Sequence, residues 1–180
     1  NAVLASGGNA LATVSWTAPV SDGGSAITNY VVSASPGAGT CTAVAPAVTC
    51  TVSGLTNGQA YTFTVVAHNA AGDSVSSSAS APATPLTKPS APTSVGAGYG
   101  NTTAQVTWLP SFSDGGSAVV SYTATSSPEG KTCTATAPSV SCEITGLTNG
   151  TAYIFTVTAR SGAYATVGDS DPSSTSAAVT

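Results

Sequence analysis

The chain has 180 residues and a formal net charge of −4, and only 6% of its residues are charged. Lys and Arg together number three, which excludes the clustered positive charge that nucleic acids and anionic membrane surfaces require. No apolar run approaches the roughly 18 residues that cross a bilayer, and no basic segment followed by an apolar run stands at the start, so membrane insertion is not expected.

The sequence consists of two copies of one module. Residues 53–67, SGLTNGQAYTFTVVA, return at residues 145–159 as TGLTNGTAYIFTVTA. Landmark residues recur 92 positions apart: Trp16 and Trp108, Tyr30 and Tyr122, Cys41 and Cys133, Leu55 and Leu147, and Tyr61 and Tyr153. Because the offset is constant over this span, we expect the two copies to share one fold.

Short runs with period-two alternation predict strands in the first copy. In chain order the runs are residues 12–16, 27–35, 48–52 and 61–68. In the last run Tyr61, Phe63 and Val65 fall on one parity, which is typical of a strand with one buried face. Turns rich in Gly, Asp and Asn separate the runs, and no helical period appears, so a sandwich of short antiparallel strands is predicted.

The four cysteines predict two local disulfides. Cys41 and Cys50 have the same separation as Cys133 and Cys142, and this equal spacing within equal modules favours the local pairs among the three possible pairings. A zinc site made from all four would require the copies to face each other, and the C-x-x-C spacing is missing. Disulfides in small modules are typical of oxidising compartments, so an extracellular location is expected.

The landmark residues resemble those of a fibronectin type III domain. The resemblance rests on Trp16 in an early strand, Tyr30 after a Gly-rich turn, and Leu55 six residues before Tyr61, the spacing of a tyrosine corner. The second copy repeats these residues, and the Thr- and Gly-rich composition is similar to tandem versions from bacterial secreted and surface proteins.

The resemblance implies an all-β fold of two tandem, seven-stranded, immunoglobulin-like sandwiches. We expect the first domain at residues 1–84, a Pro-rich linker at 85–92, and the second domain at 93–180. The family's fold implies no enzyme activity. The cysteine pairs are not a general feature of the family, and we interpret each as a bridge across the segment that joins the two sheets.

The potentially reactive residues are few, and we expect no catalytic, cofactor-binding or metal-binding site. His68 is the single histidine, and with no acidic partner nearby in sequence it is interpreted as a plain surface residue. Asp22 and Asp114 stand in equivalent Asp-Gly-Gly turns, where Asp usually bonds backbone amides. For the pair Asp169 and Asp171, a weak cation site and a solvated loop both stay open.

Three aromatic residues of the second copy have no aromatic counterpart in the first and form a candidate interface: Tyr99, Phe112 and Tyr164. The family fold implies that the loops of Phe112 and Tyr164 lie at one end of the sandwich, the end facing the first copy. Exposed aromatic residues at one pole often mark an interface. Three interpretations stay open: a wedge between the domains, a contact with another chain, and a surface that stacks on glycans.

The sequence predicts a non-enzymatic, extracellular structural module of a bacterial surface or secreted protein. Because so few residues are charged, self-association into a filament or surface layer is one expectation, and contact with neighbouring domains is another. The alternatives are a spacer or carbohydrate-binding module of a secreted polysaccharide-degrading enzyme, which would give the chain a polysaccharide partner, and an adhesin module. With Asn1 first, we expect the sequence to be a piece of a longer protein.

Overall fold

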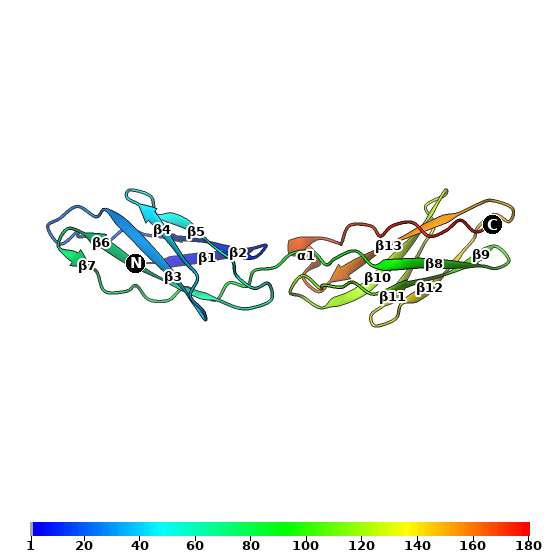
Figure 1. Ribbon diagram of the computed structural model, residues 1–180, viewed down its shortest axis with the longest axis horizontal. Helices are drawn as coiled ribbons and strands as arrows, with labels where there is room; N and C mark the ends of the chain where they lie inside the picture. Colours follow the sequence, from blue (N-terminus) through cyan, green and yellow to red (C-terminus); the bar gives the residue numbers. More distant parts are fainter. Residues whose placement is uncertain (1) are drawn as a thin grey trace. The chain divides into compact units, whose positions relative to one another are not determined.

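The computed structural model describes residues 2–180, apart from the side chain of Tyr164. The chain divides into two compact units, Asn1–Thr87 and Lys88–Thr180, here called unit 1 and unit 2 (Figure 1). Each unit is a sandwich of antiparallel sheets, so the expected all-β tandem fold is confirmed.

Unit 1 has one sheet of three strands and one of four. The three-stranded sheet has the order β1-β2-β5, and the four-stranded sheet has the order β4-β3-β6-β7. The strands are β1 (Val3–Gly8), β2 (Leu11–Trp16), β3 (Asn29–Ser35), β4 (Thr40–Val44), β5 (Thr49–Ser53), β6 (Thr62–Asn69) and β7 (Gly72–Asp73). The alternating runs of the sequence do not include β4, which carries Cys41. Only one residue of this strand, Ala43, is buried.

Unit 2 has two three-stranded sheets, ordered β12-β9-β8 and β11-β10-β13, so among the described residues it lacks a counterpart of β7 and has six of the seven expected strands. The elements are β8 (Thr93–Tyr99), β9 (Thr103–Leu109), β10 (Val119–Ser127), β11 (Thr132–Thr136), β12 (Ser141–Thr145), β13 (Ile154–Ser161) and α1 (Tyr164–Val167). The helix α1 has four residues, and no helix in residues 2–180 is long and apolar enough to span a bilayer.

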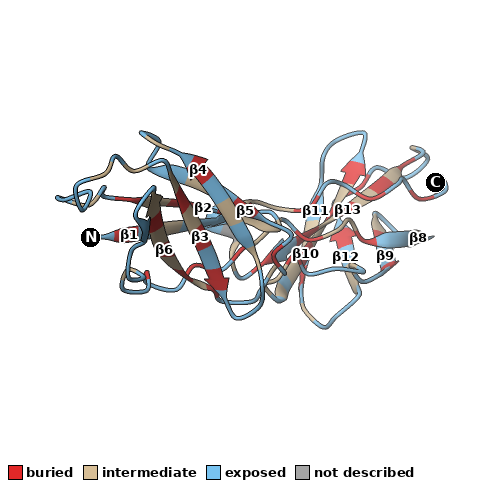
Figure 2. Cartoon of the chain, turned by 60° about the vertical axis from the view of Figure 1, so that its left-hand side comes forward, coloured by how far each residue is buried: buried red, intermediate tan, exposed pale blue. Residues whose placement is uncertain are grey.

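The core of each unit is formed by the alternating residues that the sequence predicts. In β3, buried and more exposed residues alternate along the strand, as the red and pale bands show (Figure 2). Trp16 from one sheet packs against Tyr30 from the other, with ring centroids 5.3 Å apart. Trp108 and Tyr122 repeat this contact at 5.5 Å, so the two cores are built alike.

The disulfides join the two sheets, and the tyrosine corner fixes the loop that precedes β6, where the sequence predicts them. Cys41 in β4 is bonded to Cys50 in β5, which belongs to the other sheet, and Cys133 is bonded to Cys142 in the same way. The hydroxyl of Tyr61 accepts a hydrogen bond from the Thr56 N–H at 3.1 Å, and unit 2 has the same bond at 3.0 Å.

The last segment of each unit binds its sheet through serine side chains. Ser80 donates its N–H to the carbonyl of Phe63, and its Oγ accepts the N–H of the same residue. Ser77 and Val65, and Ser74 and Ala67, repeat both bonds. We call residues 74–83 and their counterparts 170–179 the serine ladders.

Successive serines of a ladder are three residues apart, whereas the residues that they bond on the partner strand are two residues apart. In unit 2, Ser170, Ser173 and Ser176 pair with alternate residues of β13. Each repeat of the ladder therefore has one residue more than the partner strand, as in a β-bulge. The serine Oγ accepts the strand N–H that a backbone carbonyl would accept in regular pairing. The ladder thereby covers an otherwise open sheet edge.

The division between the units falls inside the segment expected to be a linker. Pro85 is fully buried, and its carbonyl accepts the Gly58 N–H at 2.8 Å in unit 1. Pro89 and Pro92 are buried as well, and they belong to unit 2. The prolines of residues 85–92 are therefore packed parts of the two units, in addition to connecting them.

Candidate functional site

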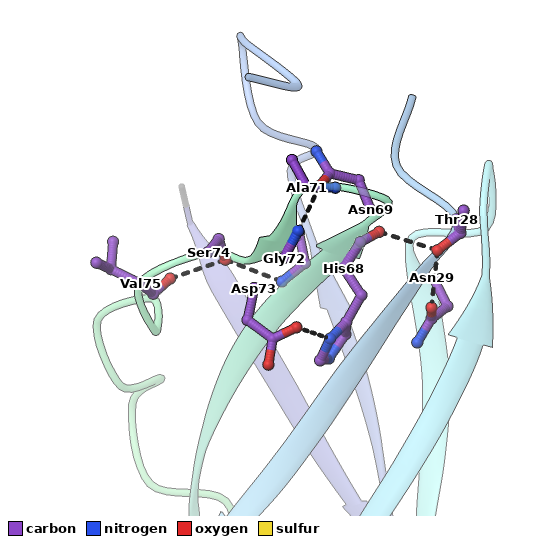
Figure 3. Close-up of polar contacts among 10 residues, drawn as sticks. Thr28, Asn29, His68, Asn69, Ala71, Gly72, Asp73, Ser74 and Val75 are labelled. Atoms are coloured by element: carbon purple, nitrogen blue, oxygen red, sulfur yellow. Dashed lines mark hydrogen bonds and ion pairs between the residues drawn. The ribbon is translucent and has the colours of Figure 1, made fainter. Parts of the chain in front are cut away.

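A group of polar contacts surrounds the turn from β6 into β7 (Figure 3). Asn69 organises this turn: its Oδ1 accepts the N–H groups of Ala71 and Gly72, and its Nδ2 donates to the carbonyls of Asp22 and Ser25. Gly72 has a φ of 134°, a backbone conformation that favours glycine. One side chain thus ties the β6–β7 turn to the loop between β2 and β3.

His68 pairs with Asp73 across the β6–β7 hairpin, so the expectation that it has no acidic partner is wrong. The two residues stand opposite each other in the strand register, and His68 Nδ1 contacts Asp73 Oδ1 directly (Figure 3). The partner lies five residues further along the chain, and a two-residue turn brings it back beside the imidazole. In the sequence, a short turn after an alternating strand indicates a hairpin, and a hairpin here brings these two residues together.

Unit 2 has a different ion pair in the equivalent place. The Arg160 guanidinium donates to both carboxylate oxygens of Asp169, at 2.9 and 3.1 Å. The next acidic residue, Asp171, accepts a hydrogen bond from Lys88 Nζ at 2.6 Å. The two carboxylates therefore pair with different basic side chains, and their side chains stay 32% (Asp169) and 75% (Asp171) exposed.

The Asp-Gly-Gly loops bind their own backbone, as the sequence predicts. Asp22 Oδ1 accepts the Gly24 N–H at 2.9 Å, and Asp114 Oδ1 accepts the Gly116 N–H at the same distance. A calcium ion would need several oxygen ligands from such a loop, and each loop supplies one carboxylate. Within residues 2–180, no three His, Cys, Asp or Glu side chains gather in a way that could hold a metal ion.

A cavity of about 360 Å³ borders the His68–Asp73 pair, and its lining includes Asp22 and Ser74. General-base catalysis requires a nucleophile within hydrogen-bond reach of the imidazole. His68 Nε2 is buried and has no hydrogen-bond partner among the described residues. The neighbouring Ser74 hydroxyl accepts the Ala67 N–H and donates to the Val75 carbonyl, so it serves the serine ladder.

The structure separates Tyr99 from the other two aromatic residues of the candidate interface. Phe112 is fully exposed in the loop after β9, whereas Tyr99 ends β8 beside the start of β9 and is 80% exposed. Tyr164 begins α1, and its side chain lies outside the described part of the chain. The Gly162 N–H donates to the Ala118 carbonyl, which places the loops of Phe112 and Tyr164 at one end of unit 2 and Tyr99 at the other.

Similar proteins were found by sequence and by structure. Residues 2–84 and 90–176 each match the family described as "Fibronectin type III domain". Endoglucanase B of Cellulomonas fimi is 36% identical over 161 residues, which make up 84% of this chain and 15% of the relative. The chain thus spans a small part of that protein's length.

Among solved structures, the two-domain fibronectin type III segment of chicken tenascin has 18% sequence identity and a TM-score of 0.45, covering 94% of this chain and 93% of that one. The FN1–FN3 domains of chicken CNTN1 have 19% identity and a TM-score of 0.47, with 97% and 64% of the two chains covered. The family matches account for nearly the whole sequence, and the chain belongs to the fibronectin type III domain family, of which it contains two tandem copies.

Proposed function

We propose that the chain is a non-catalytic, extracellular spacer module of a secreted bacterial enzyme. In this function the two units set the separation between other parts of the protein and contribute no chemistry. The similarity to part of an endoglucanase supports this context, as does the family, whose domains are typically not catalytic.

The observation that carries the proposal is the replacement of His68 by Arg160 at the equivalent position. Both residues pair with an Asp that follows the same strand, and the contact joins neighbouring backbone segments in both units. An arginine side chain does not lose its proton in proteins, so it cannot act as a general base. The shared purpose of the two pairs is therefore structural.

The exposed aromatic residues support a spacer better than a carbohydrate-binding module. A surface that stacks on successive sugar rings needs aromatic side chains close together on one face. Tyr99 and Phe112, the two members of the candidate interface whose side chains the structure describes, lie near opposite ends of β9, and the strand between Ala104 and Leu109 alone spans about 17 Å. Polysaccharide retention through these residues is accordingly not part of the proposal.

The extracellular part of the proposal rests on the disulfides. Each unit contains one, and the four cysteines are all used in these bonds. Disulfides persist in oxidising compartments and are rare in the cytosol. This agrees with a module of a secreted enzyme.

Incubation of the intact, non-reduced chain with soluble and insoluble glucans tests the proposal. We expect no new reducing ends and no retention on the insoluble polymer. Hydrolysis that disappears in His68→Arg, a change that copies unit 2, would contradict the non-catalytic assignment. Retention that disappears in Phe112→Ala, with Tyr30→Phe as a buried aromatic control, would instead support the carbohydrate-binding alternative.

A further inference from the structure

Unit 1 has two edge strands that few buried side chains hold in place. β4 lies at one end of its sheet, and β5 lies at one end of the other sheet. Each of these strands has five residues, of which one is buried: Ala43 in β4 and Val52 in β5. By contrast, β6 buries Phe63, Val65 and Ala67. The side chains of β4 and β5 therefore contribute less hydrophobic stabilisation than those of β6.

Backbone pairing holds each of these strands on one side. In the described part of the chain, β4 pairs only with β3, and β5 pairs only with β2. One further bond fixes the end of β4, because the Ala45 N–H donates to the Thr28 carbonyl at 2.9 Å. A strand with one partner strand and one buried side chain is expected to open locally before the rest of its sheet opens.

The disulfide restrains β4 by connecting it to β5. The Cα atoms of Cys41 and Cys50 are 6.2 Å apart, and disulfides rarely allow more than about 6.8 Å. Cys41 therefore cannot move far from its place while Cys50 stays opposite Val14 of β2. Since β4 and β5 belong to different sheets, opening of β4 requires that contacts in both sheets break together.

Unit 2 has the same arrangement. β11 lies at the end of one sheet and β12 at the end of the other, and each has one buried residue, Ala135 and Ile144. The Cα atoms of Cys133 and Cys142 are 6.0 Å apart. In both units the bridge thus connects the two strands that bury the fewest residues of the pairs they join.

All four cysteines are half-buried, so a small thiol can reach them. Reduction proceeds by thiol–disulfide exchange: a thiolate of a dithiol reductant attacks one sulfur, the bond between Cys41 and Cys50 breaks, and a mixed disulfide forms. The second thiol of the reductant then displaces the remaining cysteine. The protein gains two electrons and two protons as two thiols, and the reductant is oxidised to a cyclic disulfide.

We propose that the disulfide of each unit is a redox-sensitive switch, and that a dithiol releases the edge strand β4 or β11 while β5 or β12 stays in place. Release leaves the backbone N–H and C=O groups of β3 that pair with β4 without partners. An unpaired strand edge can accept an extended strand of another polypeptide. In an oxidising compartment the bridge persists, and the edge strand keeps its place.

Hydrogen exchange of the intact chain, before and after reduction with dithiothreitol, tests the proposal. The measured quantity is the ratio of the amide exchange rates of β4 and β5, because a loss of stability of the whole unit raises both rates equally. We expect a ratio within about three-fold of one in the bridged chain, and at least about ten-fold faster exchange in β4 after reduction. Reoxidation should restore the first ratio.

The variant Cys41→Ser with Cys50→Ser separates the two units. In this variant β4 should exchange ahead of β5 without any reductant. β11 and β12 should still exchange together, because the disulfide between Cys133 and Cys142 is kept. The matched variant Cys133→Ser with Cys142→Ser should give the reverse result.

The proposal is overturned if β4, β5 and β6 lose protection together after reduction, since the bridge would then stabilise the whole unit instead of one strand. It is also overturned if reduction leaves the ratio of β4 to β5 unchanged. A bridged chain in which β4 already exchanges at least about ten-fold faster than β5 would overturn it as well, because the disulfide would then not restrain the strand.

Discussion

The Oγ of Ser80 accepts a hydrogen bond from the Phe63 N–H at 3.1 Å, while the Ser80 N–H donates to the Phe63 carbonyl at 2.9 Å. One serine therefore satisfies both backbone groups of a fully buried residue. The hydroxyl also donates to the Ala81 carbonyl, so its own hydrogen is used. The same arrangement recurs at two further serines of unit 1 and at three of unit 2.

Ser80→Ala is expected to lower the unfolding free energy of unit 1 by about 1–3 kcal/mol, because the buried Phe63 N–H loses its acceptor. Ser78→Ala, two residues away and exposed, is expected to change it by less than about 0.5 kcal/mol. Chemical denaturation followed by circular dichroism measures both. Equal, small effects would show that the ladder side chains contribute nothing to stability.

Cys41→Ser combined with Cys50→Ser is expected to destabilise unit 1 by about 3 kcal/mol, because the unfolded chain gains the entropy of an open ten-residue loop. Unit 2 keeps its own disulfide and serves as an internal control. Differential scanning calorimetry should show one transition moving to lower temperature and the other staying in place. Two transitions that move together would contradict the independence of the two bridges.

Asn149→Ala is expected to cost about 1–2 kcal/mol in unit 2. Asn149 Oδ1 accepts the Thr102 N–H and its Nδ2 donates to Asn101, which fixes a hairpin residue whose φ is 55°. The exposed residue Gln59, whose side chain bonds only the adjacent Ala60 carbonyl, provides the control through Gln59→Ala. Urea denaturation measures the unfolding free energy of both variants. An equal loss in the two variants would contradict the stabilising role of the Asn149 hydrogen bonds.

Asp169→Asn is expected to cost no more than about 1 kcal/mol, because the ion pair with Arg160 is partly exposed and solvent screens it. The loss should shrink further in about 1 M salt, where the Debye length is about 3 Å. Denaturation at low and high salt measures it. A loss above about 3 kcal/mol that salt leaves unchanged would mean that the pair is a central support of the fold.

The sequence predicted the parts of the fold that depend on repetition and alternation. The cores around Trp16 and Trp108, the tyrosine corners and the disulfides lie where constant offsets and period-two patterns place them. These features can be predicted because every second residue is buried in a strand with one buried face.

Two features were missed for physical reasons. The serine ladder has a period of three, and Ser74, Ser77 and Ser80 look like ordinary surface serines to a search for period two. The His68–Asp73 contact depends on a two-residue turn that brings Asp73 back beside His68, although the two are five residues apart in the sequence.

The measurement that tests the spacer assignment most directly is the native mass of the non-reduced chain, determined by light scattering over a range of protein and salt concentrations. A spacer that neither assembles nor reacts should keep the mass of one chain, 17.2 kDa, under all conditions. A mass that climbs with protein concentration, with ordered filaments or sheets in electron micrographs of the same sample, would contradict the spacer and identify a self-assembling building block.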